Sequence, residues 1–228
     1  AYENLDKAWK AYLPHAGKAM DVSSVLPDGG RLLPSGTDVM FDNRTHWMTD
    51  AEGGNYRVFA IDGSDAQRGD ATGENMIERY CTGNFLAGQG LIYASASGLP
   101  VGRYVFKAVA QKGADGGVIE LFANDDRSPV TSVKVLRETE VATDVLDQDL
   151  TVGVESGLNN ACQWVSFADV ALEYQSPYML LEEAVAASDT LTYGEDKGGA
   201  LKKAADEARV LLVSGEARER MAAYHALL

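Results

Sequence analysis

The sequence predicts a mainly β protein, a sandwich or barrel of antiparallel strands with a small helical bundle appended. Three observations carry this prediction. The segment 98–102 is a tight turn, in which Pro100 presets φ and two glycines tolerate unusual backbone angles. Residues 103–111 then alternate strictly between two faces, which is the period of a β-strand. From Ser176 onward the apolar residues recur at helical spacing instead.

A short helix is expected at the N-terminus, and Pro14 and Gly17 end its pattern. Its apolar stripe consists of Leu5, Ala8, Trp9, Tyr12 and Leu13. Because so short a helix is not stable alone, we expect the stripe to pack on the helix predicted over 201–212. Residues 21–35 are predicted to be a loop, since prolines and paired glycines interrupt them.

Short strands separated by turns follow, with no helical pattern between them, which is typical of an all-β sandwich or barrel. The strands on either side of the 98–102 turn are expected to form a central antiparallel pair. An Asp-Gly step within 112–117 predicts a further hairpin turn. The predicted strands are 39–41, 46–48, 56–61, 76–81, 91–93, 103–111, 118–123, 130–136, 141–146, 150–154 and 162–174.

The helical tail begins at Ser176-Pro177, where serine suits the N-cap and proline the first helical position. A second helix is predicted over 201–212, with Gly215 as its stop, and a third from about Glu216 to the end. These helices predict a small antiparallel bundle, completed by the N-terminal helix.

Composition limits the classes of partner. The 228 residues carry a net charge of −14, and the pI is near 4.6, so the chain would repel nucleic-acid phosphates and anionic membrane surfaces. No apolar run approaches the roughly 20 residues needed to span a bilayer. Ala1 opens directly on the amphipathic segment, and we expect the chain to be a fragment of a larger secreted protein.

The two cysteines, Cys81 and Cys162, lie in strand-like runs and do not settle the redox compartment. We favour two small buried apolar side chains, and leave open that they are neighbours across a sheet or joined in a disulfide.

The run from Gly98 to Tyr104 resembles the "LPxGxY" turn and strand of galactose-binding-like β-sandwich domains, jelly rolls common in large secreted bacterial proteins that handle glycans. Trp47 on an early strand and Glu78 before the central pair match the usual layout of that family. Residues 163–172, QWVSFADVAL, are similar to its closing strand. The resemblance covers roughly 21–175, and the flanking helices resemble helical spacer repeats between modules of such proteins.

The resemblance implies a jelly-roll β-sandwich and, as an expectation, carbohydrate binding, although many members of the fold hold no ligand. It also implies a possible structural Ca²⁺ near the first and last strands, held by oxygen ligands. Glu78, Asp169 and Glu173 are the residues that could supply it. Strand alternation offers the other interpretation, that Asp169 and Glu173 simply face solvent, and we favour that one.

Catalysis is not expected. His15, His46 and His225 are scattered, and no nucleophile elbow, His-x-x-x-His or Cys-x-x-Cys occurs. Two carboxylates in the right places would serve a glycosidase, but their separation is not readable from sequence.

A sugar site needs an exposed aromatic ring beside polar side chains. We expect it at one end of the sandwich, with a ring platform and amides that serve the hydroxyls. The candidate rings are Tyr80, Phe85 and Trp164, and the candidate amides are Asn84, Asn160 and Gln163.

The predicted organisation is an N-terminal helix at 1–20, a jelly-roll sandwich at 21–175 and a helical spacer at 176–228. The predicted function is a non-catalytic, glycan-binding accessory module of an extracellular or cell-surface bacterial protein. Its expected partners are a carbohydrate and neighbouring modules of the same polypeptide, without nucleic acid or a membrane span. The alternatives are a structural spacer or protein-interaction module without a sugar site and, third, a glycosidase domain.

Overall fold

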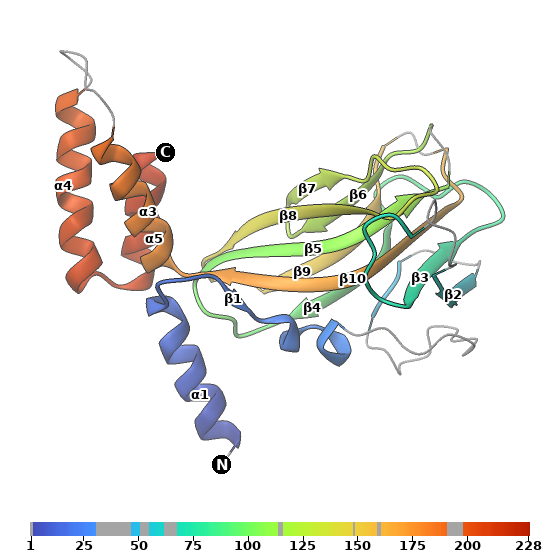
Figure 1. Cartoon of the computed structure of the whole chain (residues 1–228), viewed down its shortest axis with the longest axis horizontal. Helices are drawn as coiled ribbons and strands as arrows, with labels where there is room; N and C mark the ends of the chain where they lie inside the picture. The colour runs from blue at the N-terminus through green and yellow to red at the C-terminus, as the bar shows by residue number, and fades with distance from the viewer. Residues whose placement is uncertain are drawn as a thin grey trace.

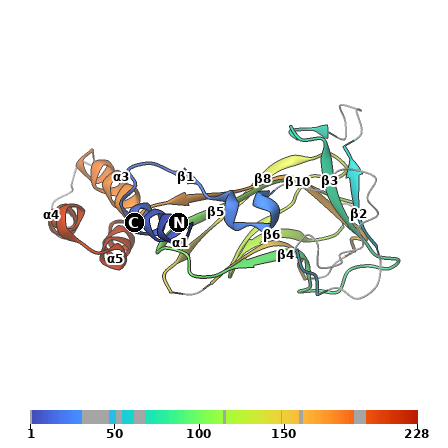
Figure 2. The ribbon, with the colours of Figure 1, turned by 90° about the horizontal axis from the view of Figure 1, so that it is seen from below.

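Two antiparallel sheets stacked face to face form the body of the molecule (Figures 1 and 2). The computed structural model describes residues 2–30, 47–50, 55–61, 68–113, 116–147, 149–158, 161–190 and 198–228. Sheet A contains β1 (Met20–Asp21), β2 (Asn55–Ala60), β3 (Asn75–Tyr80), β5 (Gly102–Lys112), β8 (Arg137–Val145) and β10 (Trp164–Gln175). Sheet B contains β4 (Gly90–Ala96), β6 (Ile119–Ala123), β7 (Asp126–Pro129) and β9 (Leu150–Ser156).

The strand order is β2-β3-β10-β5-β8 in sheet A, with β1 beside the second half of β10, and β4-β9-β6-β7 in sheet B. Neighbours in the sheets are antiparallel. This arrangement is the predicted β-sandwich, and the longest strands, β5 and β10, lie side by side at the centre of sheet A.

The expected hairpin around the 98–102 turn is wrong. β4 pairs with β9 in sheet B, whereas β5 pairs with β10 and β8 in sheet A, so the turn carries the chain from one sheet to the other. Packing explains this, because both strands have an apolar face and bury it between the sheets. The residues at this crossover pack closely. The ring centroids of Tyr104 and Tyr174 are 5.1 Å apart, and a Cβ on Gly102 would lie 2.4 Å from the Tyr174 ring.

The main core lies between the sheets. Each long strand contributes alternate residues to it, among them Phe106 from β5, Phe167 from β10 and Leu121 from β6, all with no exposed surface. Trp47 meets Phe167 edge-on at 5.5 Å in the same cluster. A second, smaller apolar cluster covers part of the outer face of sheet A; we call it the outer cluster, and it consists of Ile61, Ala71, Met76, Val109, Leu136 and Ala168.

Residues 130–136 are not the strand that their composition predicts. After the β6–β7 hairpin the chain passes through an irregular turn, in which the Ser132 hydroxyl donates to the Val135 carbonyl and Lys134 has φ +58°. The segment is anchored by Val130 and Leu136 at its ends, which are buried in the two different clusters. Of the early predicted strands, 39–41 lies outside the described residues, and Met48 forms an isolated bridge with Tyr93.

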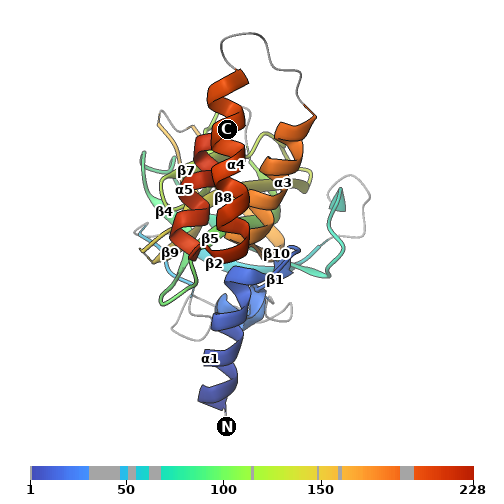
Figure 3. The same cartoon turned by 90° about the vertical axis from the view of Figure 1, so that its left-hand side faces the viewer.

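Three helices form a bundle at one end of the sandwich: α3 (Pro177–Asp189), α4 (Gly198–Ser214) and α5 (Ala217–Leu227) (Figures 1 and 3). The predicted cap is present, because the Ser176 hydroxyl accepts from the Met179 N–H. A separate apolar cluster holds the helices together and includes Leu181, Ala208 and Met221.

The bundle is joined to the sandwich through Arg103 of β5. Its Nε donates to Asp144 on β8 at 2.8 Å, and its Nη1 donates to the Tyr224 hydroxyl on α5 at 2.7 Å. The guanidinium also lies over the Tyr224 ring, 5.1 Å from its centroid. His225 reaches the same carboxylate at 3.0 Å. Side chains from both parts therefore meet at one half-buried carboxylate.

The N-terminal helix α1 (Tyr2–Tyr12) does not pack along α4 as expected, but points away from the bundle (Figures 1 and 3). Its end and the following turn η1 (Leu13–His15) are anchored at the junction instead. Leu13 is fully buried in the sandwich core, where Trp9 packs against it, and Arg220 of α5 reaches His15 at 3.1 Å. The two short turns η2 (Ser23–Val25) and η3 (Pro27–Gly30) follow β1. Across the described ranges, no helix is both long and apolar enough to cross a membrane.

Candidate functional site

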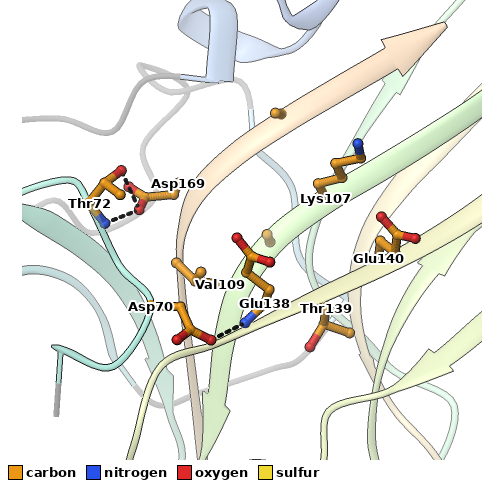
Figure 4. A pocket seen from close by; sticks show the side chains of 10 residues that line it. Asp70, Thr72, Lys107, Val109, Glu138, Thr139, Glu140 and Asp169 are labelled. Carbon is orange, nitrogen blue, oxygen red and sulfur yellow. Dashed lines mark hydrogen bonds between the residues drawn. The ribbon is translucent and has the colours of Figure 1, made fainter. Parts of the chain in front are cut away.

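A pocket of about 580 Å³ lies on the outer face of sheet A (Figure 4). Strand register builds its floor. Ala171 on β10, Lys107 on β5 and Glu140 on β8 are successive partners in one row, and Val109 and Glu138 form the adjacent pair. These side chains point outward because their strand neighbours fill the core. The full lining is Asp70, Thr72, Lys107, Ala108, Val109, Glu138, Thr139, Glu140, Asp169 and Ala171.

A bulge in β10 places Asp169 on the wall of this pocket. The register with β5 shifts between Ala168 and Ala171, and Asp169 has φ +48°, a conformation that aspartate tolerates better than most residues. Its carboxylate accepts from the Thr72 N–H, the Thr72 hydroxyl at 3.0 Å and the Gly73 N–H at 2.9 Å (Figure 4). A Cβ on Gly73 would lie 2.5 Å from this carboxylate, so a larger residue there would have to displace the Asp169 side chain.

Asp70 attaches the loop that contains Thr72 and Gly73 to β8. Its carboxylate accepts from Arg137 at 2.7 Å and from the Glu138 N–H at 3.2 Å (Figure 4). The Glu138 N–H first, and then Arg137, hold the pKa of Asp70 below its ordinary value. Gly69 precedes it with φ +51°, and a Cβ there would collide with the Leu136 carbonyl. The loop is therefore attached to both β8 and β10, and forms a fixed wall.

Lys107 is the one basic side chain that lines the pocket, as far as its described lining goes. It forms an ion pair with Glu173 of β10 at 2.9 Å. The hydrogen bond that Lys107 donates to Glu173, and then the charges of Glu173, Glu140 and Glu138, raise the pKa of Lys107. The same contact lowers the pKa of Glu173. With four carboxylates on the lining and its lysine already paired, the pocket is a negative site rich in hydrogen-bond acceptors.

The three carboxylates predicted for Ca²⁺ do not come together. Glu78 accepts from Ser166 at 3.4 Å, Asp169 caps the Thr72–Gly73 backbone, and Glu173 is paired with Lys107. Over the residues that the structure describes, no group of three His, Cys, Asp or Glu side chains could hold a metal ion. Asp169 and Glu173 lie on the outward face of β10, where each carboxylate has a partner rather than simply facing solvent.

Two of the three rings predicted for a sugar platform lie on one surface. Tyr80 and Trp164 lie directly opposite each other on β3 and β10, and both are half-buried on the outer face of sheet A. Phe85 is wrong as a platform, because it packs in the core with 4% of its surface exposed. Gln163 is exposed beside Trp164, whereas Asn160 lies outside the described residues.

Asn84 is exposed at a smaller pocket of about 270 Å³ at the end of the sandwich. That pocket is lined by Asp50, Arg79, Cys81, Asn84, Phe85, Leu86 and Gln89. Asn84 therefore shares a pocket with Phe85, not with Trp164, and the predicted set divides between two places.

Sequence reasoning missed most of the larger pocket. Of its lining, only Asp169 was a candidate, and for a metal. One signal was available: the segment 62–74 is the longest polar stretch between predicted strands, and long loops often carry function. Glu138 and Glu140 fall between the predicted strands 130–136 and 141–146, whereas in the structure they belong to β8.

No family model matches the chain, and no curated protein sequence is similar to it. Among solved structures, a Stig cyclase, FisC from Fischerella sp. TAU in complex with (3Z)-3-(1-methyl-2-pyrrolidinylidene)-3H-indole, is 18% identical over 70% of this chain and 99% of that one, with a TM-score of 0.51. The CBM22-1 xylan-binding domain of Paenibacillus barcinonensis Xyn10C is 11% identical over 58% of this chain and 87% of that one (TM-score 0.40).

The CBM22-1 and catalytic modules of a Clostridium thermocellum xylanase, complexed with xylohexaose, are 10% identical over 66% of this chain and 28% of that one (TM-score 0.39). At these identities the likeness concerns the fold. The chain is a sandwich of two antiparallel β-sheets with helices appended.

Proposed function

We propose that this chain is a non-catalytic module that binds a neutral, hydroxyl-rich ligand, a carbohydrate, in the pocket on the outer face of sheet A. The observation that carries the proposal is the row formed by Ala171, Lys107 and Glu140, which puts an apolar floor, a cation and an acceptor within one pocket. The pocket volume of about 580 Å³ is within the usual range for small-molecule sites.

The chemistry of the lining suits sugar hydroxyls. The carboxylates of Glu138 and Glu140 accept from hydroxyl groups, while Lys107 donates to ring and hydroxyl oxygens. Val109 and Ala171 offer an apolar surface to the C–H face of a pyranose. No aromatic ring is among the described residues of the lining, so we expect weak affinity, with Kd roughly in the micromolar to millimolar range.

The charge of the pocket restricts the ligand further. Four lining carboxylates face one lysine that Glu173 already neutralises, and the chain as a whole carries −14. A uronate or sulfated glycan would be repelled at the encounter and would find no unpaired cation in the lining. Neutral oligosaccharides, and those with free amino groups, are the compatible class.

Glycosidase chemistry has little support in this geometry. Its two carboxyl groups must flank the scissile bond. Glu138 and Glu140 are both exposed and lie two residues apart on one strand, so they approach a ligand from the same side. Asp70 and Asp169 each serve as an acceptor for the backbone of the neighbouring segment.

A spacer or protein-interaction module is the second candidate, favoured by the junction between Arg103, Asp144 and Tyr224. That junction would hold the bundle at a fixed angle to the sandwich, as a rigid connector between modules of one extracellular polypeptide requires. The two functions are compatible in one chain, but only the first requires a ligand in the pocket.

The test is a binding screen of the whole chain against neutral, amino and acidic oligosaccharides, followed by calorimetric titration of any hit. The proposal expects binding of neutral or amino glycans and none of acidic ones. Absence of binding across the screen would favour the spacer. Tight binding of an acidic glycan would contradict the charge argument.

A further inference from the structure

Cys81 and Cys162 meet at the end of the β3–β10 ladder. The strand pairing runs to Tyr80 opposite Trp164, and the hydrogen bond from the Cys81 N–H to the Gln163 carbonyl, 2.9 Å long, continues it by one residue. Cys162 directly precedes Gln163. Opposite residues in an antiparallel pair lie about 5 Å apart and the rise is about 3.3 Å, so the two cysteine Cα atoms are roughly 6 Å apart.

That separation falls in the range of about 4.4 to 6.8 Å that a disulfide bridges. The side chains also share a side of the sheet. Cys162 is fully buried in the core between the sheets, and Cys81 packs against the same cluster. In a regular strand, neighbouring side chains point to opposite faces. Because Gln163 is the residue opposite Cys81, a regular strand would put Cys162 on the other face of the sheet from Cys81. β10 begins only at Trp164, and the irregular backbone before it turns Cys162 toward the core.

We infer that Cys81 and Cys162 form an intramolecular disulfide when the chain is exposed to an oxidising thiol–disulfide buffer. Both are thiols in the structure: the Cys81 thiol donates to the Gly83 carbonyl and the Cys162 thiol to the Trp164 carbonyl. Burial raises the pKa of the Cys81 thiol, so the thiolate forms more readily at mildly alkaline pH.

The reaction is a pair of thiol–disulfide exchanges with a small disulfide such as oxidised glutathione. Cys81, which is partly exposed and lines the smaller pocket, attacks first as the thiolate and releases one glutathione thiol. Cys162 then loses its proton, attacks the Cys81 sulfur of the mixed disulfide and releases the second. The protein loses two electrons and two protons, and the small disulfide gains them.

The disulfide would link the ends of β3 and β10 next to the aromatic pair of Tyr80 and Trp164. Tyr80 precedes one cysteine directly, and Trp164 is two residues beyond the other. The closed loop contains roughly 80 residues, a length for which the chain-entropy account gives a large stabilisation, equivalent here to a rise in Tm of about 10 °C.

The test uses the intact chain, equilibrated in glutathione buffers from fully reducing to fully oxidising. Alkylation under denaturing conditions, intact mass and peptide mapping report the state of each cysteine. We expect two alkylated thiols at the reducing end and none at the oxidising end, with a cross-linked peptide that contains Cys81 and Cys162, and a higher Tm.

Cys81→Ser and Cys162→Ala are the matched controls, because each removes the bond with a small change of volume, and neither should show the redox-dependent Tm. Two alkylatable thiols at every potential would overturn the inference. So would a glutathione adduct on Cys81 that never resolves, since it would show that Cys162 cannot reach that sulfur.

Discussion

Trp164 on β10 lies directly opposite Tyr80 on β3, with both rings on the outer face of sheet A. This aromatic pair and the pocket share that face but not a location. Trp164 and Asp169 are five positions apart on β10, about 16 Å at the rise of a strand, and the outer cluster lies between them. Substitutions can therefore address the two places separately.

The Trp164 ring packs against Gly113. A Cβ on Gly113 would lie 2.3 Å from the indole nitrogen, so we expect Gly113→Ala to displace the ring, shift the tryptophan emission and cost about 1–3 kcal/mol in unfolding free energy. Gly83→Ala is the control, since its Cβ would meet open space. Fluorescence and urea unfolding measure both. Unchanged emission in Gly113→Ala would mean that the indole does not rest there.

The carboxylate of Asp169 is expected to hold the pocket wall. Asp169→Ala removes the acceptor for Thr72 and Gly73 and puts alanine at φ +48°, so we expect a loss of about 2 kcal/mol in unfolding free energy. Asp169→Asn keeps one oxygen and tolerates that φ, and should lose less. Hydrogen exchange at the amides of Thr72 and Gly73 should quicken most in the alanine variant. Equal effects of the two substitutions would contradict this role.

The ion pair between Lys107 and Glu173 predicts a pH dependence. Glu173 has a pKa below its ordinary 4.5. The ionised carboxylate therefore adds its full contribution to the unfolding free energy above pH 4.5, and this contribution is lost as the pH falls through the lowered pKa. Lys107 has a pKa above its ordinary 10.5, so its contribution is complete below that pH and is lost as the pH rises through the raised value. Because Lys107 is 41% exposed, the pair is worth at most about 1 kcal/mol.

Glu173→Gln should therefore be less stable than the parent chain at pH 7, and the difference should vanish near pH 2. Glu207→Gln, which removes an exposed partner of Lys203 on α4, is the control and should change stability little at either pH. A Glu173→Gln difference that persists in acid would show that packing, not charge, is responsible.

The N-terminal segment should stabilise the contact between the sandwich and the helical bundle mainly through residues 9–17, and little through the first turns of α1. Deleting residues 1–8 keeps Trp9, Leu13 and Ala16, and should lower Tm little. Deleting residues 1–17 removes two side chains that are at most 1% exposed, Leu13 and Ala16, and the carbonyl of Ala16 that accepts from the Ser176 hydroxyl. We expect a fall of several degrees by calorimetry. Equal melting of the two truncated chains would contradict this.

The β-rich body and the helical tail were predictable because periodicity is local: the alternation in 103–111 and the cap at Ser176 are both in the structure. Which strands pair is not local. The 98–102 turn looks like a hairpin, but only the burial of two apolar faces decides that it crosses between sheets.

The pocket was harder to predict from the sequence for the same reason. Ala171, Lys107 and Glu140 are far apart in the sequence and meet only through the register of three strands. Asp169 could be placed on the outward face from alternation, but its position over the pocket depends on a bulge that no residue pattern announces. Phe85 looked exposed beside polar residues, and tertiary packing buried it.

A glycan in the pocket on the outer face of sheet A would need the space above Ala171. Ala171→Gln should therefore block it, because the longer side chain fills the floor between Lys107 and Asp169 without removing any acceptor. Ser95→Gln on β4, an exposed position of the other sheet, is the matched control, and Trp164→Ala tests the aromatic pair.

The measurement is the Kd for the best neutral oligosaccharide from the screen, by calorimetric titration of the parent chain and the three variants. We predict that Ala171→Gln weakens binding at least tenfold, roughly 1.4 kcal/mol, while Ser95→Gln and Trp164→Ala stay within about twofold. Unchanged affinity in Ala171→Gln, with binding lost in Trp164→Ala, would contradict the account and move the sugar to the aromatic pair.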